Sequence, residues 1–185
     1  MTEVLSPVPL VAAMELLLGW LGGSTHAAGL LFGGVTILIT IAPPYAFVLH
    51  GVRRGRFTDR HLGDRRQRLI PLLMAMAATG IGIFILVRLG APRLVLAGAG
   101  TVGLGLLVGA AINHFWKMSG HTAAAAAVLV ICAEVGHGWS LLAVPVIALI
   151  GWSRVRLGDH TVAQVVVGAA VGALIAAVAM PILAG

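Results

Sequence analysis

Long runs of uncharged residues constrain this chain more than any other feature of its sequence. Runs without Asp, Glu, Lys or Arg cover residues 27–49, 69–87, 94–113, 135–153 and 161–185. About 18 or more uncharged apolar residues are enough for a helix to cross a bilayer. A shorter run, 118–133, ends at Glu134, and we expect it to form a further span with Glu134 near the far membrane surface.

The composition favours the same class of protein. Hydrophobic residues make up 59% of the chain and charged residues 10%, whereas a soluble domain has about a quarter of its residues charged. We therefore predict an all-α integral membrane protein with one domain over residues 1–185 and a six-transmembrane-helix bundle over residues 27–185. The predicted spans lie near residues 27–50, 69–89, 93–116, 120–136, 139–153 and 160–184.

The N-terminal region differs from these spans. Residues 9–22 are apolar, but the segment is short and contains Glu15. A segment of this length is more typical of an interfacial or re-entrant helix than of a full span. No Lys or Arg precedes it, so it does not resemble a signal peptide. We expect residues 1–26 to form a short N-terminal interfacial or re-entrant segment.

The charges gather on one predicted membrane face. Two spans separate the loop 50–68 from residues 117–121, and two more separate those from residues 154–160, so all three segments share one face. The opposite face keeps Arg88 and Arg93. The rule that basic loops stay inside predicts a multi-pass protein of the cell membrane with this basic face in the cytoplasm. The net charge of +6 then reflects orientation and contact with anionic membrane lipids, and we expect no nucleic-acid partner.

Small residues inside the spans indicate close helix packing. Gly168 and Gly172 form a small-xxx-small pair, as do Gly105 and Gly109. Such pairs let helix backbones approach in lipid, and a homodimer through one of them is the alternative to an internal seam. The G-x-G-x-x-G pattern at residues 98–103 lies inside a predicted span rather than after a strand, so we reject a dinucleotide site there.

Histidines stand among the cations of the basic face. His121 and His160 each lie at the start of a span, with Lys117 four residues before the first and Arg154 six residues before the second. Helix N-termini attract anions, and arginine binds phosphate bidentately. Two histidines beside an anion site can act as nucleophile and general acid. The pattern predicts a site for phosphate chemistry.

Two motifs resemble those of a known family. Met-Ser-Gly-His-Thr at residues 118–122 resembles the Pro-Ser-Gly-His motif of the type 2 phosphatidic acid phosphatase superfamily. Ser153-Arg154, followed after five residues by His160, resembles that family's third motif, Ser-Arg-x5-His-x3-Asp. The resemblance covers roughly residues 50–175, and the family's first motif, Lys-x6-Arg-Pro, is matched only by Arg65-x2-Arg68-x2-Pro71.

Three positions depart from the family pattern. Met118 stands in place of the motif proline, and Gln164 in place of the final aspartate. The lysine of the first motif is missing, and Lys117 is a candidate replacement.

The resemblance implies hydrolysis of a lipid phosphate without a metal or other cofactor. His160 would attack phosphorus and form a phosphohistidine, while His121 would protonate the leaving oxygen and Gln164 would accept a hydrogen bond from the ring of His160. No tight ligand spacing such as H-E-x-x-H points to a metal site. The groups expected to hold the phosphoryl oxygens come from Arg154, Lys117, Arg68, Arg65, Ser119 and Gly120.

The resemblance leaves several functions open. The substrates we expect are polyprenyl phosphates or diphosphates, or phosphatidate-like glycerolipids. Because of Gln164 and the eroded first motif, the alternative is a degenerate family member that binds or translocates a phospholipid. A third possibility is a structural protein whose arginine-rich loop docks a partner or anionic lipid. A membrane prenyltransferase needs paired aspartates for magnesium, and Asp59, Asp64 and Asp159 are not paired.

Overall fold

The described chain is helical throughout. The computed structural model describes residues 6–58, 65–136 and 144–185, with the backbone alone at residues 65 and 66. No strand occurs within these ranges. The helices are α1 (Pro7–Gly22), α2 (His26–Thr36), the π-helix η1 (Ile37–Ile41), α3 (Ala42–Arg53), the 3-10 helix η2 (Arg65–Arg68), α4 (Leu69–Arg88), α5 (Arg93–Phe115), α6 (Gly120–Gly136), α7 (Val144–Arg156) and α8 (Val162–Ala184).

Four helical segments of the described chain are long and apolar enough to cross a membrane. They are His26–Arg53, Leu69–Arg88, Arg93–Phe115 and Val162–Ala184, with lengths of 28, 20, 23 and 23 residues. Two further apolar helices, α1 and α6, are shorter. The all-α prediction is confirmed, and the long apolar helices indicate a membrane protein.

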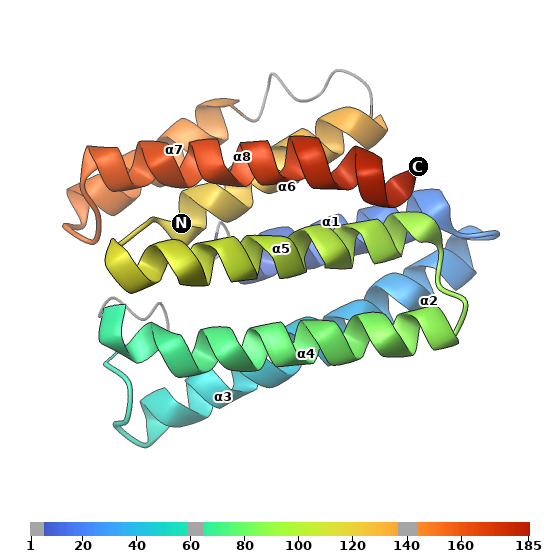
Figure 1. The fold of residues 1–185 in the computed structure, drawn as a ribbon, viewed down its shortest axis with the longest axis horizontal. Helices are drawn as coiled ribbons and strands as arrows, with labels where there is room; N and C mark the ends of the chain where they lie inside the picture. The colour runs from blue at the N-terminus through green and yellow to red at the C-terminus, as the bar shows by residue number, and fades with distance from the viewer. Residues whose placement is uncertain (1–5, 59–64, 137–143) are drawn as a thin grey trace.

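The long helices lie side by side, so the connections between them gather at the two ends of the bundle (Figure 1). The end of α3, the start of α4 and the α5–α6 and α7–α8 connections share one end, on the left in Figure 1. The α1–α2 turn, the α4–α5 loop and the C-terminus lie at the other end. Alternating spans predict that residues 50–68, 117–121 and 154–160 share a face. The described parts of these three segments do lie at one end of the bundle.

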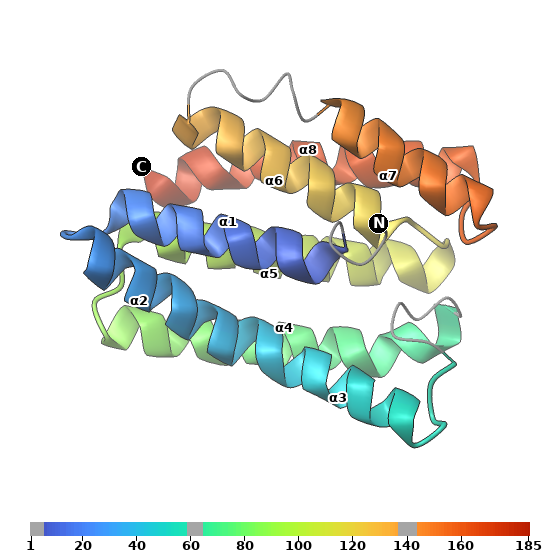
Figure 2. The same cartoon turned by 180° about the vertical axis from the view of Figure 1, so that it is seen from behind.

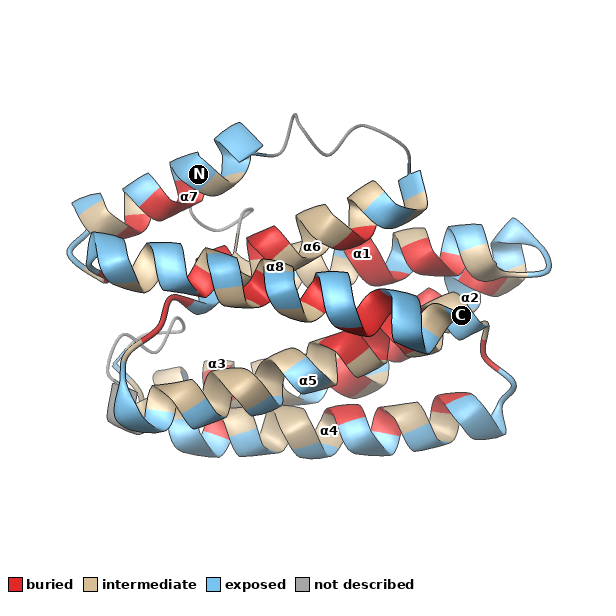
Figure 3. Ribbon diagram, turned by 45° about the horizontal axis from the view of Figure 1, so that its top comes forward, coloured by how far each residue is buried: buried red, intermediate tan, exposed pale blue. Residues whose placement is uncertain are grey.

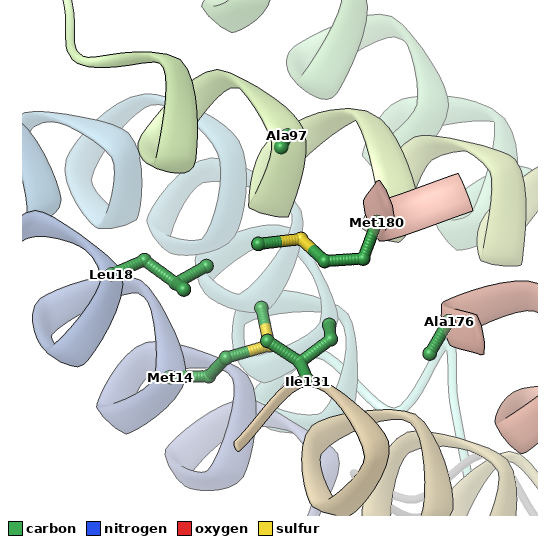
Figure 4. Packing of buried hydrophobic residues seen from close by; sticks show 6 residues of the cluster. All are labelled: Met14, Leu18, Ala97, Ile131, Ala176 and Met180. Atoms are coloured by element: carbon green, nitrogen blue, oxygen red, sulfur yellow. The ribbon is translucent and has the colours of Figure 1, made fainter. Parts of the chain in front are cut away.

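The N-terminal helix belongs to the core of the bundle, which corrects the interfacial position expected from its length and from Glu15. Figure 2 shows α1 running lengthwise beside α5 and α6. Its Met14 and Leu18 pack into one hydrophobic cluster, shown in Figure 4, together with Ala97, Ile131, Ala176 and Met180.

The close approach of α1 has a plain steric cause. A Cβ at Gly33 of α2 would lie 2.8 Å from the backbone oxygen of Glu15, and a Cβ at Gly98 of α5 would lie 3.2 Å from both Glu15 carboxyl oxygens. Because these glycines have no side chain, α1 packs closely against α2 and α5, and Glu15 is only 1% exposed. The re-entrant alternative for this segment stays a prediction.

The first long span is interrupted at its prolines. Pro43 and Pro44 lie in the first turn of α3, and the preceding turn is the π-helix η1. Proline cannot donate to the carbonyl four residues before it, so the regular bonding of α2 cannot continue through this point. The helical hydrogen-bond pattern shifts by one residue there, so the N–H of Ala42 donates to the carbonyl of Ile37.

The glycine pair of α8 is a packing seam within the chain. A Cβ at Gly168 would lie 2.5 Å from the carbonyl oxygen of Ser119, and one at Gly172 would collide with the carbonyl of Ala123. Helix α6 therefore rests directly on the backbone of α8, and both glycines are buried. Figure 3 shows buried positions, coloured red, on both helices. A Cβ at Gly105 would meet no described atom within 4 Å, so this glycine forms no seam with the described helices.

Candidate functional site

The α7–α8 connection folds His160 back toward Arg154. Gly158 has a φ of +72°, a conformation that glycine adopts without strain and that commonly ends helices. The N–H groups of Asp159 and His160 both donate to the carbonyl oxygen of Arg154, at 3.1 and 3.3 Å. Arg154 and His160, six residues apart in the sequence, are therefore in direct backbone contact.

Gln164 fixes the ring of His160. Its Oε1 lies 3.0 Å from Nδ1 of His160 and also accepts the N–H of Thr161 at 3.2 Å. The N–H of Gln164 in turn donates to Oγ1 of Thr161, which completes a capping box at the start of α8. Since an amide oxygen only accepts, Nδ1 of His160 carries the hydrogen in this arrangement. The neutral ring therefore has its lone pair on Nε2, the atom from which a nucleophile would attack.

The surroundings of His160 favour its neutral form. Burial lowers the pKa of His160 below its ordinary value, and the positive charges of Arg68 and Lys117 lower it further. The hydrogen bond that Nδ1 of His160 donates to Gln164 and the negative charge of Asp159 act in the opposite direction and raise this pKa. The net shift is downward, so protonation of the ring is disfavoured at neutral pH, and the lone pair of Nε2 is available there.

The N-terminus of α6 lies against the first turn of α8. The N–H of Ser119 donates to the carbonyl of Gln164 at 3.2 Å, and Oγ1 of Thr122 donates to the carbonyl of Val165 at 2.9 Å. His121, in the first turn of α6, is 8% exposed and is thereby carried to the same region as His160. Gly120 is exposed at the start of the helix, where an N–H has no intrahelical acceptor and can face an anion.

Ser119 has a structural task at this helix start. Its side chain is fully buried, and its Oγ accepts the N–H of Thr122 at 3.5 Å. Both its backbone N–H and its Oγ are therefore engaged with protein atoms. In this structure Ser119 shapes the N-terminus of α6, and the N–H group expected to meet a phosphoryl oxygen is that of Gly120.

Three cationic side chains come to this end from three separate segments. Nη1 of Arg68, at the start of α4, lies 3.3 Å from the carbonyl of Met118 and 3.4 Å from Oδ1 of Asn113. Nζ of Lys117 donates to the carbonyl of Asp159 at 2.6 Å. These bonds tie the α3–α4, α5–α6 and α7–α8 connections into one network.

Arg154 is the most deeply buried of the three cations. It is 3% exposed, and its Nη1 pairs with Oδ2 of Asp159 at 3.2 Å. Its Nε is buried and has no hydrogen-bond partner among the described residues. Buried guanidinium N–H groups are seldom left unpaired, so an anion is the natural partner for this edge of the side chain.

The structure brings most of the sequence-predicted site together. The side chain of Arg65 lies outside the described residues. Sequence reasoning missed Asp159, Asn113 and the capping box of Thr161. The pattern Thr-x-x-Gln before an apolar run was a readable signal for that box. The predicted residues that gather at this end are His160, His121, Gln164, Arg154, Lys117, Ser119, Gly120 and Arg68.

The site thus belongs to an all-helical protein with several long apolar helices, and it places a cluster of histidines and cations at one end of the bundle. Among the described residues, no three His, Cys, Asp or Glu side chains are arranged as a metal site. Comparisons with family models, with curated proteins and with solved structures find no match to this chain.

Proposed function

We propose that this protein is a membrane phosphatase that hydrolyses a lipid phosphate without a metal ion. The observation that carries the proposal is the setting of His160. Gln164 holds its Nδ1, burial and neighbouring cations favour its neutral ring, and Arg154, Lys117 and Arg68 reach the same end of the bundle. A neutral nucleophile among cations is what attack on a phosphate anion requires.

The proposed reaction has two steps. Nε2 of His160 attacks phosphorus, a P–N bond forms, and the P–O bond to the lipid breaks as His121 gives its proton to the leaving oxygen. Water then attacks the phosphohistidine, gives a proton back to His121, and releases inorganic phosphate as the P–N bond breaks. Positioning and charge stabilisation by Arg154, Lys117 and Arg68 supply most of the catalysis in such a transfer.

A lipid substrate suits the surroundings of the site. Phe115, Trp116 and Trp152 are exposed at this end of the bundle, with exposed fractions of 82%, 38% and 61%. Aromatic side chains of this kind concentrate where a membrane meets water. The site then lies at the depth of lipid headgroups. The proposed substrates are polyprenyl phosphates or diphosphates, or phosphatidate-like glycerolipids.

The proposal includes six spans and a cytoplasmic site. The two spans beyond the four long helices are α6, with 17 residues, and a segment that includes α7, with 13. Six arginines outside the candidate site remain on the basic face, at positions 53, 54, 56, 60, 66 and 156, against Arg88 and Arg93 on the other. A cysteine at Thr58 in a Cys132→Ala background should resist an impermeant thiol reagent in intact cells. Ready labelling would reverse the orientation.

A second function is favoured by one feature of the site. The cations already have protein partners, since Arg154 and Lys117 both bond to Asp159, and Gln164 serves a capping box as well as His160. A site of this kind can bind or translocate a phospholipid without hydrolysing it. A homodimer and docking of a protein partner also stay untested expectations.

Phosphate release from purified protein in detergent separates these functions. The substrates are a polyprenyl phosphate, a polyprenyl diphosphate and phosphatidate, each with and without EDTA. We expect release that resists EDTA, is lost in His160→Ala, and is kept in His114→Ala, which changes an exposed histidine on α5. Tight lipid binding without release supports the binding function. If the protein neither binds nor hydrolyses any of these lipids, the phosphatase function and the lipid-binding function are both ruled out.

A further inference from the structure

We propose that Asp159 is a positioning residue that sets both the orientation of Arg154 and the charge balance around His160. This inference rests on the proposed function and names a residue that the phosphatase motifs leave out. Three separate groups of Asp159 take part, namely its carboxylate, its carbonyl oxygen and its N–H.

The contacts of Asp159 make it the centre of the network. Its Oδ2 accepts from Nη1 of Arg154, its carbonyl oxygen accepts from Nζ of Lys117, and its N–H donates to the carbonyl of Arg154. The next residue in the chain is His160. A shift of Asp159 would therefore move two cations and the nucleophile together.

The pairing with Arg154 leaves one edge of the guanidinium for a ligand. The Nε–H shares one edge of the planar guanidinium with Nη2, and the bond to Asp159 is made through Nη1. The buried Nε has no partner among the described residues. An arginine held by a carboxylate on one side presents a fixed N–H edge on the other, which is the geometry that bidentate contact with phosphate uses.

Asp159 also supplies a negative charge that Gln164 cannot. Gln164 orients the ring of His160 through a neutral oxygen. The charged groups that act on His160 are Arg68 from the start of α4, Lys117 from the α5–α6 connection and Asp159 beside it. When His160 attacks phosphorus its ring becomes cationic, and Asp159 offsets the repulsion from the two cations. In the resting protein the same charge raises the pKa of His160, against the larger lowering by burial.

The test compares Asp159→Asn with a matched control, Glu134→Gln. Both changes remove one negative charge, but Glu134 is exposed near the far end of α6. For Asp159→Asn we expect kcat to fall about tenfold to a hundredfold, because the guanidinium of Arg154 loses the carboxylate that orients it. Loss of the carboxylate charge also lowers the pKa of His160, so the acid limb of kcat/KM moves to lower pH. Asp159→Glu restores the charge and should return the acid limb toward its original position.

A second measurement does not depend on turnover. The ring of His160, assigned by its absence in His160→Ala, is titrated by nuclear magnetic resonance in the substrate-free protein. Its pKa should drop in Asp159→Asn and stay unchanged in Glu134→Gln. Binding of orthovanadate, a phosphate mimic, should weaken in Asp159→Asn if the carboxylate orients Arg154.

The outcomes separate this inference from the proposed function. If the native protein hydrolyses lipid phosphate but Asp159→Asn keeps its kcat and its acid limb, Asp159 is not a positioning residue and the phosphatase proposal stands. If the native protein hydrolyses none of the substrates, the phosphatase proposal fails. The titration and vanadate binding then still decide whether Asp159 governs His160 and Arg154, and unchanged values in both would overturn the inference.

Discussion

Polar side chains are buried in two regions of this molecule, and the two regions satisfy them differently. At the site end, hydrogen bonds join segments far apart in the sequence. Lys117 reaches Asp159, and the N–H of Ser119 reaches the carbonyl of Gln164. Between α1, α2, α4 and α5, Thr36 donates only to the carbonyl of Phe32 in its own helix.

The second region also holds polar atoms without partners. Oε2 of Glu15 and Oγ1 of Thr101 are buried and have no hydrogen-bond partner among the described residues. Thr40 donates within its own helical segment, to the carbonyl of Thr36. These groups do not fix one helix relative to another, whereas those of the site end do. Hydrogen bonds between distant segments therefore distinguish the end with the candidate site. Burial of a polar group does not, because it occurs in both regions.

Among the following substitutions, we expect the largest loss of activity at His121, in the cross-linked region. His121→Ala removes the proposed proton donor and should lower kcat by about 10² to 10⁴ for a lipid phosphate. The loss should be smaller for a substrate whose leaving group is acidic, because that oxygen needs less protonation. The measurement is kcat for an alkyl phosphate and for a nitrophenyl phosphate of similar chain length. Equal losses for both substrates would show that His121 is not the acid.

Gln164 should give the next largest effect, because one side chain serves two functions there. Gln164→Leu removes the acceptor for His160 and also the capping box, and it should cost about 1 kcal/mol of stability and most of the activity. Gln164→Glu keeps an acceptor that reaches both donors, and it should retain activity. Phosphate release and thermal unfolding are measured on both variants. Full activity in Gln164→Leu would show that residue 164 does not orient His160.

The seam between α6 and α8 tests whether packing holds the network together. In Gly168→Ala the new Cβ would lie 2.5 Å from the carbonyl oxygen of Ser119 and 2.7 Å from Oγ1 of Thr122. Displacing the start of α6 should cost about 1–3 kcal/mol and reduce activity with it. The matched control is Gly105→Ala, which meets no described atom and should stabilise α5 by up to about 1 kcal/mol. Similar behaviour of the two variants would mean that the seam does not position the site.

The smallest effect should come from Glu15, in the region without cross-linking bonds. Glu15→Gln keeps the size of the side chain and removes its ability to ionise. Since no described residue forms a hydrogen bond to Oε2 of Glu15, we expect unchanged phosphate release and a change in stability within about 1 kcal/mol. A loss of activity comparable to that of Gln164→Leu would mean that the interior polar groups are coupled to the site.

The sequence predicted the grouping of the site more reliably than the details within it. Uncharged runs gave the alternation of spans, and alternation was enough to place residues 65–68, 117–121 and 154–160 at one end. The tasks of Asp159 and Ser119 were not predictable, because hydrogen bonds across segments depend on how closely α6 and α8 pack. The core position of α1 was missed for a similar reason. Glu15 suggests a membrane surface in the sequence, whereas its burial follows from the close approach that the missing side chains of Gly33 and Gly98 allow.

The most direct test of the account is to trap the covalent intermediate. A lipid phosphate labelled with phosphorus-32 is mixed with the native protein in EDTA and quenched within one turnover. The account predicts label on the protein that survives alkali, is lost in acid, maps to the peptide containing His160, and is absent from His160→Ala. Phosphate release with no label on the protein, or label that persists in His160→Ala, would contradict it.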